Sequence, residues 1–143
     1  MWRDKRRNGQ GKLTWPSGAC YEGEYKDDCR EGKGKMKYAD DTMYDGDWAN
    51  EKKEGYGVFT WTNGTVYKGN FLNDEISGFG TITYAGHGNA SYEGEWLKGK
   101  KHGRGKMTYK DTSVFDGYWK EDKRHGQNCK MTFSNGMVYE GEF

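Results

Sequence analysis

The stretch Tyr92-Glu93-Gly94-Glu95-Trp96 (YEGEW) has five near copies in this chain of 143 residues. Each copy reads aromatic-x-Gly-x-aromatic, and the six copies begin at Tyr21, Tyr44, Tyr67, Tyr92, Phe115 and Tyr139. The steps between these positions are 23, 23, 25, 23 and 24 residues. A second motif, Gly-x-Gly, keeps the same phase and begins at Gly9, Gly32, Gly55, Gly78 and Gly103, with a degenerate copy at Gly126. Two linked motifs at one period indicate a repeat array.

Within each repeat the side chains alternate with a period of two, which is the pattern of a β-strand. In the second repeat, Met36 and Tyr38 fall on one face, while the lysines between them fall on the other. After a turn-forming stretch, Tyr44 and Trp48 share a face, with two aspartates opposite. Each repeat therefore predicts a β-hairpin with one apolar face and one charged face. About six polar residues, such as 49–54, are expected to form a linker loop to the next hairpin.

The composition favours a thin aromatic layer over a thick aliphatic core. Hydrophobic residues make up 32% of the chain, yet 16% of the chain is aromatic and 23 residues are glycine. When the repeats are stacked, the rings fall into columns at the strand ends. A glycine such as Gly23 or Gly46 lies between two rings of the same face, where a Cβ would lift the rings off the backbone.

Bulk properties exclude several classes of protein. A net charge of +1 gives no support to nucleic acid as a partner. The chain has no apolar run of about 18 residues that could span a membrane, and its basic start lacks the apolar segment of a signal peptide. Three cysteines without metal-ligand spacing favour a reduced, cytoplasmic setting. Association with the cytoskeleton or with a membrane is the further expectation for localisation.

The unit from Tyr92 to Tyr109, YEGEWLKGKKHGRGKMTY, resembles the MORN (membrane occupation and recognition nexus) repeat, and the resemblance recurs six times over the whole chain. It implies an all-β fold: an elongated single-sheet solenoid of six antiparallel β-hairpin repeats of about 23 residues, curved and twisted into an open trough. Residues 1–143 are expected to form one domain that belongs to a longer array. The sixth repeat departs from the pattern, because Cys129 stands where Gly105 stands in the fifth, which predicts a β-bulge.

No catalytic constellation is present in the sequence, so neither enzymatic activity nor a cofactor is expected. His102 and His125 occupy the same place in neighbouring repeats and are weak candidates for a shared metal ion. The simpler interpretation, typical of the family that the chain resembles, is that both are loop residues.

Aromatic side chains are the first candidates for binding a partner. We expect a groove for an extended or helical peptide, or for self-association, lined by Trp48, Trp61, Tyr67, Tyr92 and Trp96, although each of these rings also belongs to the core. Tyr56 and Phe79 are the middle residues of two Gly-x-Gly motifs and could form an exposed patch. Contact with a partner and local packing of the hairpins are both open interpretations of this pair.

Basic residues of the expected linkers suggest a second partner. Cations near an anionic membrane contribute about 1 kcal/mol each. The candidates for contact with anionic phospholipids are Lys5, Arg6, Arg7, Lys98, Lys100, Lys101, Lys123 and Arg124. The leading hypothesis is a non-catalytic scaffold for protein partners, with a phosphoinositide-binding module as the alternative. A third, implied by the resemblance alone, is a targeting domain of a larger enzyme such as a lipid kinase or a lysine methyltransferase.

Overall fold

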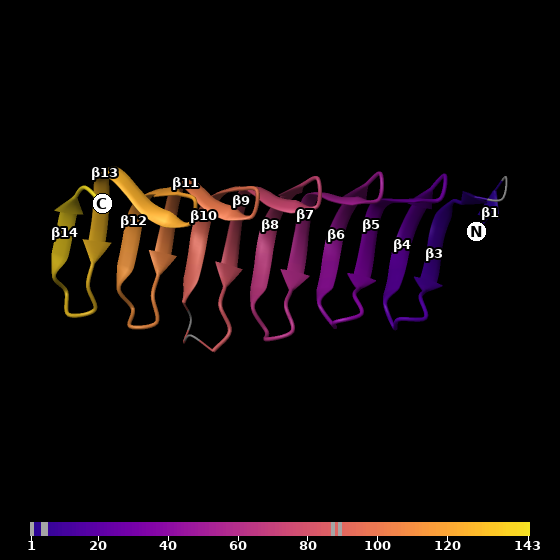
Figure 1. Ribbon diagram of the computed structural model, residues 1–143, viewed down its shortest axis with the longest axis horizontal. Coiled ribbons are helices and arrows are strands. Elements are labelled where there is room, and N and C mark those ends of the chain that lie inside the picture. Colours follow the sequence, from indigo (N-terminus) through magenta and orange to yellow (C-terminus); the bar gives the residue numbers. More distant parts are fainter. Residues whose placement is uncertain (1, 4–5, 87, 89) are drawn as a thin grey trace.

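The computed structural model describes residues 2–3, 6–86, 88 and 90–143, and the described part consists of strands and turns without a helix. Twelve antiparallel strands, β3 to β14, form one sheet in chain order, and they stand side by side along the long axis of the molecule (Figure 1). A short ladder of β1 with β2 precedes this sheet. The predicted open sheet of successive hairpins is confirmed. The strands are β1 Trp2–Arg3, β2 Arg6–Arg7, β3 Gly9–Thr14, β4 Cys20–Lys26, β5 Cys29–Lys37, β6 Met43–Ala49, β7 Lys52–Thr60, β8 Val66–Leu72, β9 Glu75–Thr83, β10 Ser91–Leu97, β11 Lys100–Thr108, β12 Val114–Lys120, β13 Lys123–Thr132 and β14 Val138–Gly141.

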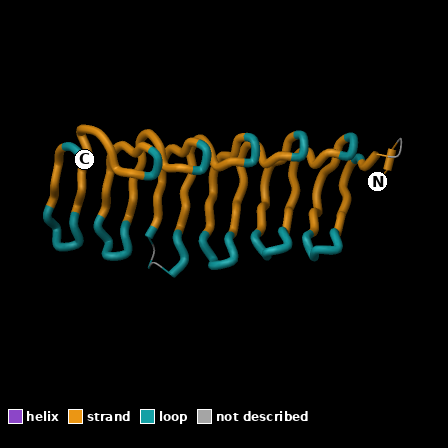
Figure 2. Tube along the Cα trace, in the orientation of Figure 1, coloured by secondary structure: helices purple, strands orange, loops and turns teal. Residues whose placement is uncertain are grey.

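Turns lie along two opposite rims of the sheet (Figure 2). On one rim are wide loops, in which a side chain such as Asn63 accepts a hydrogen bond from the N–H two residues on, at 2.9 Å. The other rim carries tight two-residue turns with positive φ at both positions, as at Asn50 (50°) and Glu51 (71°). These values are typical of type I′ turns. The expected six-residue linkers are therefore wrong: residues 49 and 52–54 belong to strands, and only 50–51 form the turn.

The two glycines of each Gly-x-Gly motif have different structural roles. The first, such as Gly32 with φ of 79°, lies in a bulge at which the register between β4 and β5 shifts. The second, such as Gly34, lies beneath the ring of the preceding tyrosine, and a Cβ there would be 2.1 Å from the Tyr21 hydroxyl oxygen. Opposite it, a Cβ on Gly23 would be 2.4 Å from the Gly34 Cα. Facing glycines thus let the ring lie on the backbone.

The rings form one continuous edge-to-face row. Tyr44 packs against Trp48 of its own motif and against Phe71 of the next, with ring centroids 5.1 and 5.0 Å apart. Tyr67 does the same with Phe71 and Trp96, at 5.3 and 5.6 Å. Such edge-to-face pairs contribute about 0.5–1.5 kcal/mol each beyond the burial of their area. The core therefore runs along the whole sheet as a single layer of rings.

In the last repeat, the predicted bulge at Cys129 is confirmed. The register between β12 and β13 shifts between Asp116 and Tyr118, and the extra residue Asn128 has a φ of 58°. Because the described part contains no helix at all, it has no helix that could cross a membrane.

Candidate functional site

Four of the five rings expected to line a groove are buried. The exposed fractions are 3% for Trp48, 0% for Tyr67 and Tyr92, and 6% for Trp96. Trp61 is half-buried and packs on Phe59, with ring centroids 4.7 Å apart. Edge-to-face partners and backbone glycines occupy the space on either side of the buried rings. These four rings are therefore core residues, and a hollow on this face, of about 480 Å³, lies beside Tyr38 and Phe59 instead.

Cationic side chains cover this layer of rings from above. The cations sit two residues before the first glycine of a Gly-x-Gly motif, in all motifs but the fourth, where this residue is Ile76. The guanidinium carbon of Arg30 lies 4.7 Å from the centre of the Trp48 ring. The Lys101 ammonium lies 5.6–5.9 Å from four rings. Aliphatic stems thus cover apolar surface, while the charged groups gain cation–π contacts. The same position carries Arg7, Arg30, Lys53, Ile76, Lys101 and Arg124.

Acidic residues of the next tight turn hold four of these cations in place. The ion-pair distances are 3.0 Å for Arg7–Asp28, 3.1 Å for Arg30–Glu51, 3.6 Å for Lys53–Asp74 and 3.8 Å for Lys101–Asp122. Hydrogen bonds from the Arg7 backbone and side chain lower the pKa of Asp28. The partners are always 21 residues apart. This fixed separation of cation and acid is a signal in the sequence, and the net charges of the expected linkers do not reveal it.

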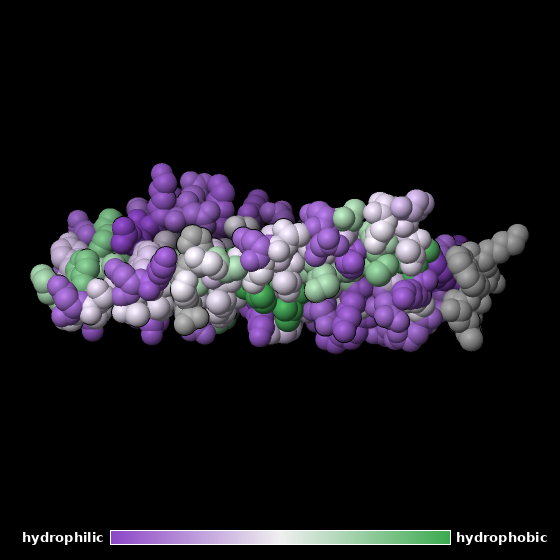
Figure 3. Space-filling model, turned by 90° about the horizontal axis from the view of Figure 1, so that it is seen from below, coloured by the Kyte–Doolittle hydropathy of each residue, from purple (hydrophilic) through white to green (hydrophobic). Residues whose placement is uncertain are grey.

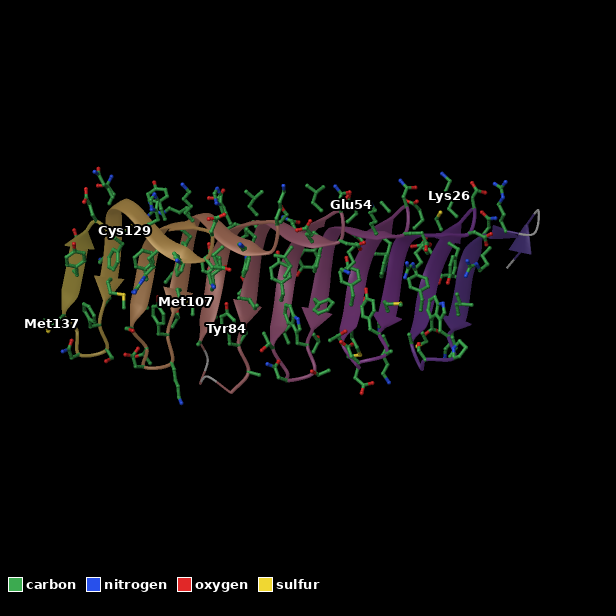
Figure 4. The ribbon with its side chains drawn as sticks, in the orientation of Figure 1. Lys26, Glu54, Tyr84, Met107, Cys129 and Met137 are labelled. Carbon is green, nitrogen blue, oxygen red and sulfur yellow. The ribbon has the colours of Figure 1, made fainter. Side chains whose placement is uncertain are left out.

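The candidates for lipid contact therefore divide into two groups. Arg7, Lys101 and Arg124 lie over rings, and Arg124 is 5.1 Å from the centre of the Phe143 ring. Lys98, Lys100 and Lys123 are exposed at the rim of the tight turns, the rim on which Figure 4 labels Lys26 and Glu54. Arg6 is exposed and lies 3.8 Å from Asp27. Lys5 falls outside the described residues.

The two histidines are exposed and lie apart. His102 is on β11 and His125 on β13, with β12 between them. Residues 2–3, 6–86, 88 and 90–143, searched together, contain no cluster of three or more His, Cys, Asp or Glu suited to a metal ion.

The charged face, opposite the rings, carries charges that alternate from strand to strand. Lysines of β5 face aspartates of β6, and Lys35 and Asp45 form an ion pair at 3.9 Å. Lys33 forms a further ion pair with Asp47. On the same face, toward the C-terminal end of the sheet, Arg104 of β11 pairs with Asp116 of β12 at 3.4 Å. Cross-strand ion pairs thus neutralise part of this face.

Three central strands, β7 to β9, interrupt this alternation. Away from the rim of the tight turns, where Lys52, Glu54 and Glu75 lie, their outward side chains are uncharged apart from one lysine. These uncharged side chains and the lysine together form what we name the central window. Tyr56 and Phe79 are its largest members, with exposed fractions of 54% and 56%. The window consists of Tyr56, Val58, Thr60, Val66, Lys68, Asn70, Phe79, Thr81 and Thr83.

The central window is hollowed. Seven of its residues, together with Gly69 and Gly80, line a hollow of about 800 Å³ that has Tyr56 and Phe79 on its walls. A second hollow of about 530 Å³ begins at Lys68 and extends to β4. The hollow of about 480 Å³ on the face of the rings lies beside the wide turn at Tyr38 and Asp40, and in the view of this rim hydrophobic residues come to the surface in small separate groups (Figure 3). The structure thus confirms that Tyr56 and Phe79 are exposed and brings them to one concavity.

A single open sheet of consecutive hairpins, with rings packed on facing glycines, defines the chain as a β-hairpin repeat protein. Sequence comparison agrees, because the model of the MORN repeat matches residues 1–20, 21–43, 44–66, 67–88, 92–114 and 115–138. The chain belongs to the MORN repeat family. No curated protein matches it in sequence.

Two solved structures from Drosophila melanogaster are similar in fold. One is the TCP domain of SAS-4 (dCPAP) in complex with a proline-rich motif of Ana2 (dSTIL); its TM-score is 0.52 at 12% identity, over 94% of this chain and 84% of that one. The other is the TCP10c domain of Sas-4, with a TM-score of 0.46 at 15% identity, over 94% of this chain and 93% of that one. The first likeness shows that other proteins also build this kind of open sheet.

Proposed function

We propose that this chain is a non-catalytic scaffold that binds a protein partner, and that the central window is the docking surface. The observation that carries the proposal is the hollow of about 800 Å³ between two rings that are each more than half exposed. Exposed aromatic side chains beside a concavity are typical of interaction sites, because they bury a large area with few rotatable bonds.

The position of these rings supports binding over packing. Tyr56 and Phe79 are the middle residues of their Gly-x-Gly motifs, where the other repeats carry Gln10, Lys33, Arg104 and Gln127. Those repeats form the same strands with polar residues at this position. The fold therefore does not need a ring at either place, and the two rings are available for a partner.

An extended peptide is the most suitable partner for a first test. The similar domain from Drosophila melanogaster was solved in complex with a proline-rich motif of another protein, so a sheet of this shape can present a peptide-binding surface. The position that we propose for the site on this chain is inferred from the chain's own residues and not from the similar domain. A peptide lying across β7 to β9 would place apolar side chains against both rings.

The test is a selection of random peptides displayed on phage, with wild-type protein as bait. The variant Tyr56→Lys/Phe79→Arg removes both rings and introduces residues that other repeats already carry at this position. We expect selected peptides to bind the wild type and to lose about tenfold or more in affinity for the variant, because each interface ring contributes about 1–2 kcal/mol.

A third ring of the same face provides the control. Tyr118 is 40% exposed, but it lies under the Arg104 guanidinium, 5.2 Å from its ring centre, and does not line the hollow. The variant Tyr118→Gln should bind the selected peptides as the wild type does. Equal binding to the wild type and to the Tyr56/Phe79 variant, with circular dichroism showing both folded, would contradict the proposal.

A membrane surface is the second candidate partner. Lys98 lies in one tight turn and Lys100 follows it, Lys123 follows the next turn, and Leu97 beside Lys98 is 47% exposed. Exposed cations next to an apolar side chain are suited to anionic lipid head groups. Sedimentation with phosphatidylserine vesicles at low salt tests this candidate, with Lys98→Glu/Lys100→Glu as the variant. If the wild type stays in the supernatant, this candidate is wrong.

A further inference from the structure

We infer that the central window selects peptides that carry one acidic side chain between uncharged ones, and that Lys68 binds the carboxylate of this acidic residue. This inference rests on the proposed function, because it names the chemistry of the partner that the same surface would take. It follows from the pattern of charges around Lys68 rather than from the two rings.

Lys68 lies at the centre of the window and is exposed. Its register partners are Val58 on β7 and Thr81 on β9, so neither neighbouring strand places a carboxylate beside it. The ion pairs found on the charged face, within the part of the chain that the structure describes, belong to Lys33, Lys35, Lys37 and Arg104 and not to Lys68. A cation set among uncharged side chains can meet an anionic group of a ligand without first breaking an internal pair.

The carboxylates at the borders of the window have cations beside them. In the row of Lys68, Asp45 lies beyond Val58 on one side and Glu93 beyond Thr81 on the other. Each is two strands away from Lys68, which is about 10 Å. Asp45 forms an ion pair with Lys35 at 3.9 Å, and the register partner of Glu93 on β11 is Lys106, so cations accompany both carboxylates. Within the window, Lys68 is the one charged side chain, and the surface is therefore complementary to a single negative charge on the ligand.

Beyond the borders, the carboxylates are fixed in place. Asp47 accepts a hydrogen bond from the Tyr56 backbone N–H at 3.2 Å, and Glu95 accepts one from the Arg104 N–H at 2.8 Å. Asp47 also forms an ion pair with Lys33, so this border is suited to uncharged residues in the flanks of the ligand. Lys68 also lines both hollows, so a ligand can fill either one while its acid stays over the lysine.

The test compares three pools of synthetic peptides that have the same randomised apolar flanks and differ in a fixed central Glu, Gln or Lys. Binding to the purified protein is measured by fluorescence polarisation at low salt. We expect the wild type to bind the Glu pool on the order of tenfold more tightly than the Lys pool, because a hydrogen-bonded ion pair in a hollow contributes more than one at an open surface. The variant Lys68→Glu should reverse this preference.

Two variants serve as controls. Lys26→Glu changes the net charge by the same amount at the rim, away from the window (Figure 4), and should keep the preference for the Glu pool. Lys68→Met removes the charge but keeps an apolar stem, and should bind the Glu and Gln pools alike. If the wild type binds all pools equally, or if Lys68→Glu keeps the wild-type order, the inference is wrong while the proposed peptide site stands. If no pool binds at all, the proposed function fails and the inference fails with it.

Discussion

The fifth aromatic motif, which begins at Phe115, differs from the fourth, which begins at Tyr92, in its first ring and in the residue on which that ring lies. In the fourth, the Tyr92 hydroxyl donates a hydrogen bond to the Glu95 carbonyl at 2.9 Å and lies over Gly105. In the fifth, Phe115 has no hydroxyl, and Cys129 replaces the glycine. A Cβ built on Gly94 would meet the Tyr92 hydroxyl at 2.8 Å, while one built on Gly117 would meet the Cys129 sulfur at 2.7 Å. The thiol thus takes the place of the missing hydroxyl.

The thiol fills the space beside the glycine but donates to other carbonyl oxygens than the tyrosine hydroxyl does. Cys129 is 1% exposed, and its sulfur lies 3.5–3.6 Å from the carbonyl oxygens of residues 125–127 in the bulge. The added residue Asn128 gives the strand room for the side chain. What the array requires is a filled space beside the ring, and two different pairs of residues meet this requirement.

The largest expected effect is at alkaline pH, and it falls on the tyrosine repeats. Burial raises the pKa of Tyr21 to about 12, and it also raises the pKa of Tyr44, Tyr67 and Tyr92. Because the unfolded value is 10.0, this stabilisation is fully present below pH 10 and is lost as the pH rises toward 12. Circular dichroism and tyrosinate absorbance should therefore change together in a late step. Ionisation of the buried tyrosines with an unchanged dichroism signal would contradict the burial argument.

Gly105→Ala should be the most damaging single substitution in this comparison. The new Cβ would lie 2.0 Å from the Tyr92 hydroxyl oxygen, and the ring cannot move away because Trp96 and Trp119 pack against it. We expect a loss of about 3 kcal/mol or more in the free energy of unfolding, measured in urea. Gly11→Ala is the matched control: it is the second glycine of its own motif, but among the described side chains a Cβ there meets the Tyr25 ring alone, at 3.4 Å. Equal losses in both variants would show that backbone freedom, not the ring, is responsible.

A double-mutant cycle between Phe115 and Cys129 tests the exchange of hydroxyl for thiol. Phe115→Tyr should place its hydroxyl against the sulfur, and Cys129→Gly should leave a gap beside the ring. Each single change should cost about 1–3 kcal/mol. The double variant restores the combination of the fourth repeat, so it should lose about 1–2 kcal/mol less than the sum of the two. Additive losses in urea unfolding would mean that the two residues act independently.

The sequence predicted the repeat, the hairpins, the sheet and the bulge at Cys129, because each depends on local spacing. It did not predict the tight turns, because Asn50 and Glu51 are simply two more polar residues unless their positive φ values are known. It also placed Lys101 among the exposed cations. The chain turns back at 98–99 and bends at the bulge, and this geometry brings the lysine over the rings. Exposure of Tyr56 and Phe79 was predicted, whereas the hollow between them depends on how three strands lie together.

The smallest change in stability is expected at the side chain that covers the rings from the strand end, because this side chain already differs between neighbouring repeats. Lys101 lies over Tyr92 and pairs with Asp122, while Ile76, at the same position one repeat earlier, packs on the core without a charge. Lys101→Ile should therefore change the free energy of unfolding by less than about 1 kcal/mol, because the apolar cover is kept and the lost ion pair is half-exposed. Lys101→Asp, which uncovers the rings and places a second carboxylate beside Asp122, should cost more. A large loss in Lys101→Ile, measured in urea at low and high salt, would mean that the charge and not the stem holds this layer in place.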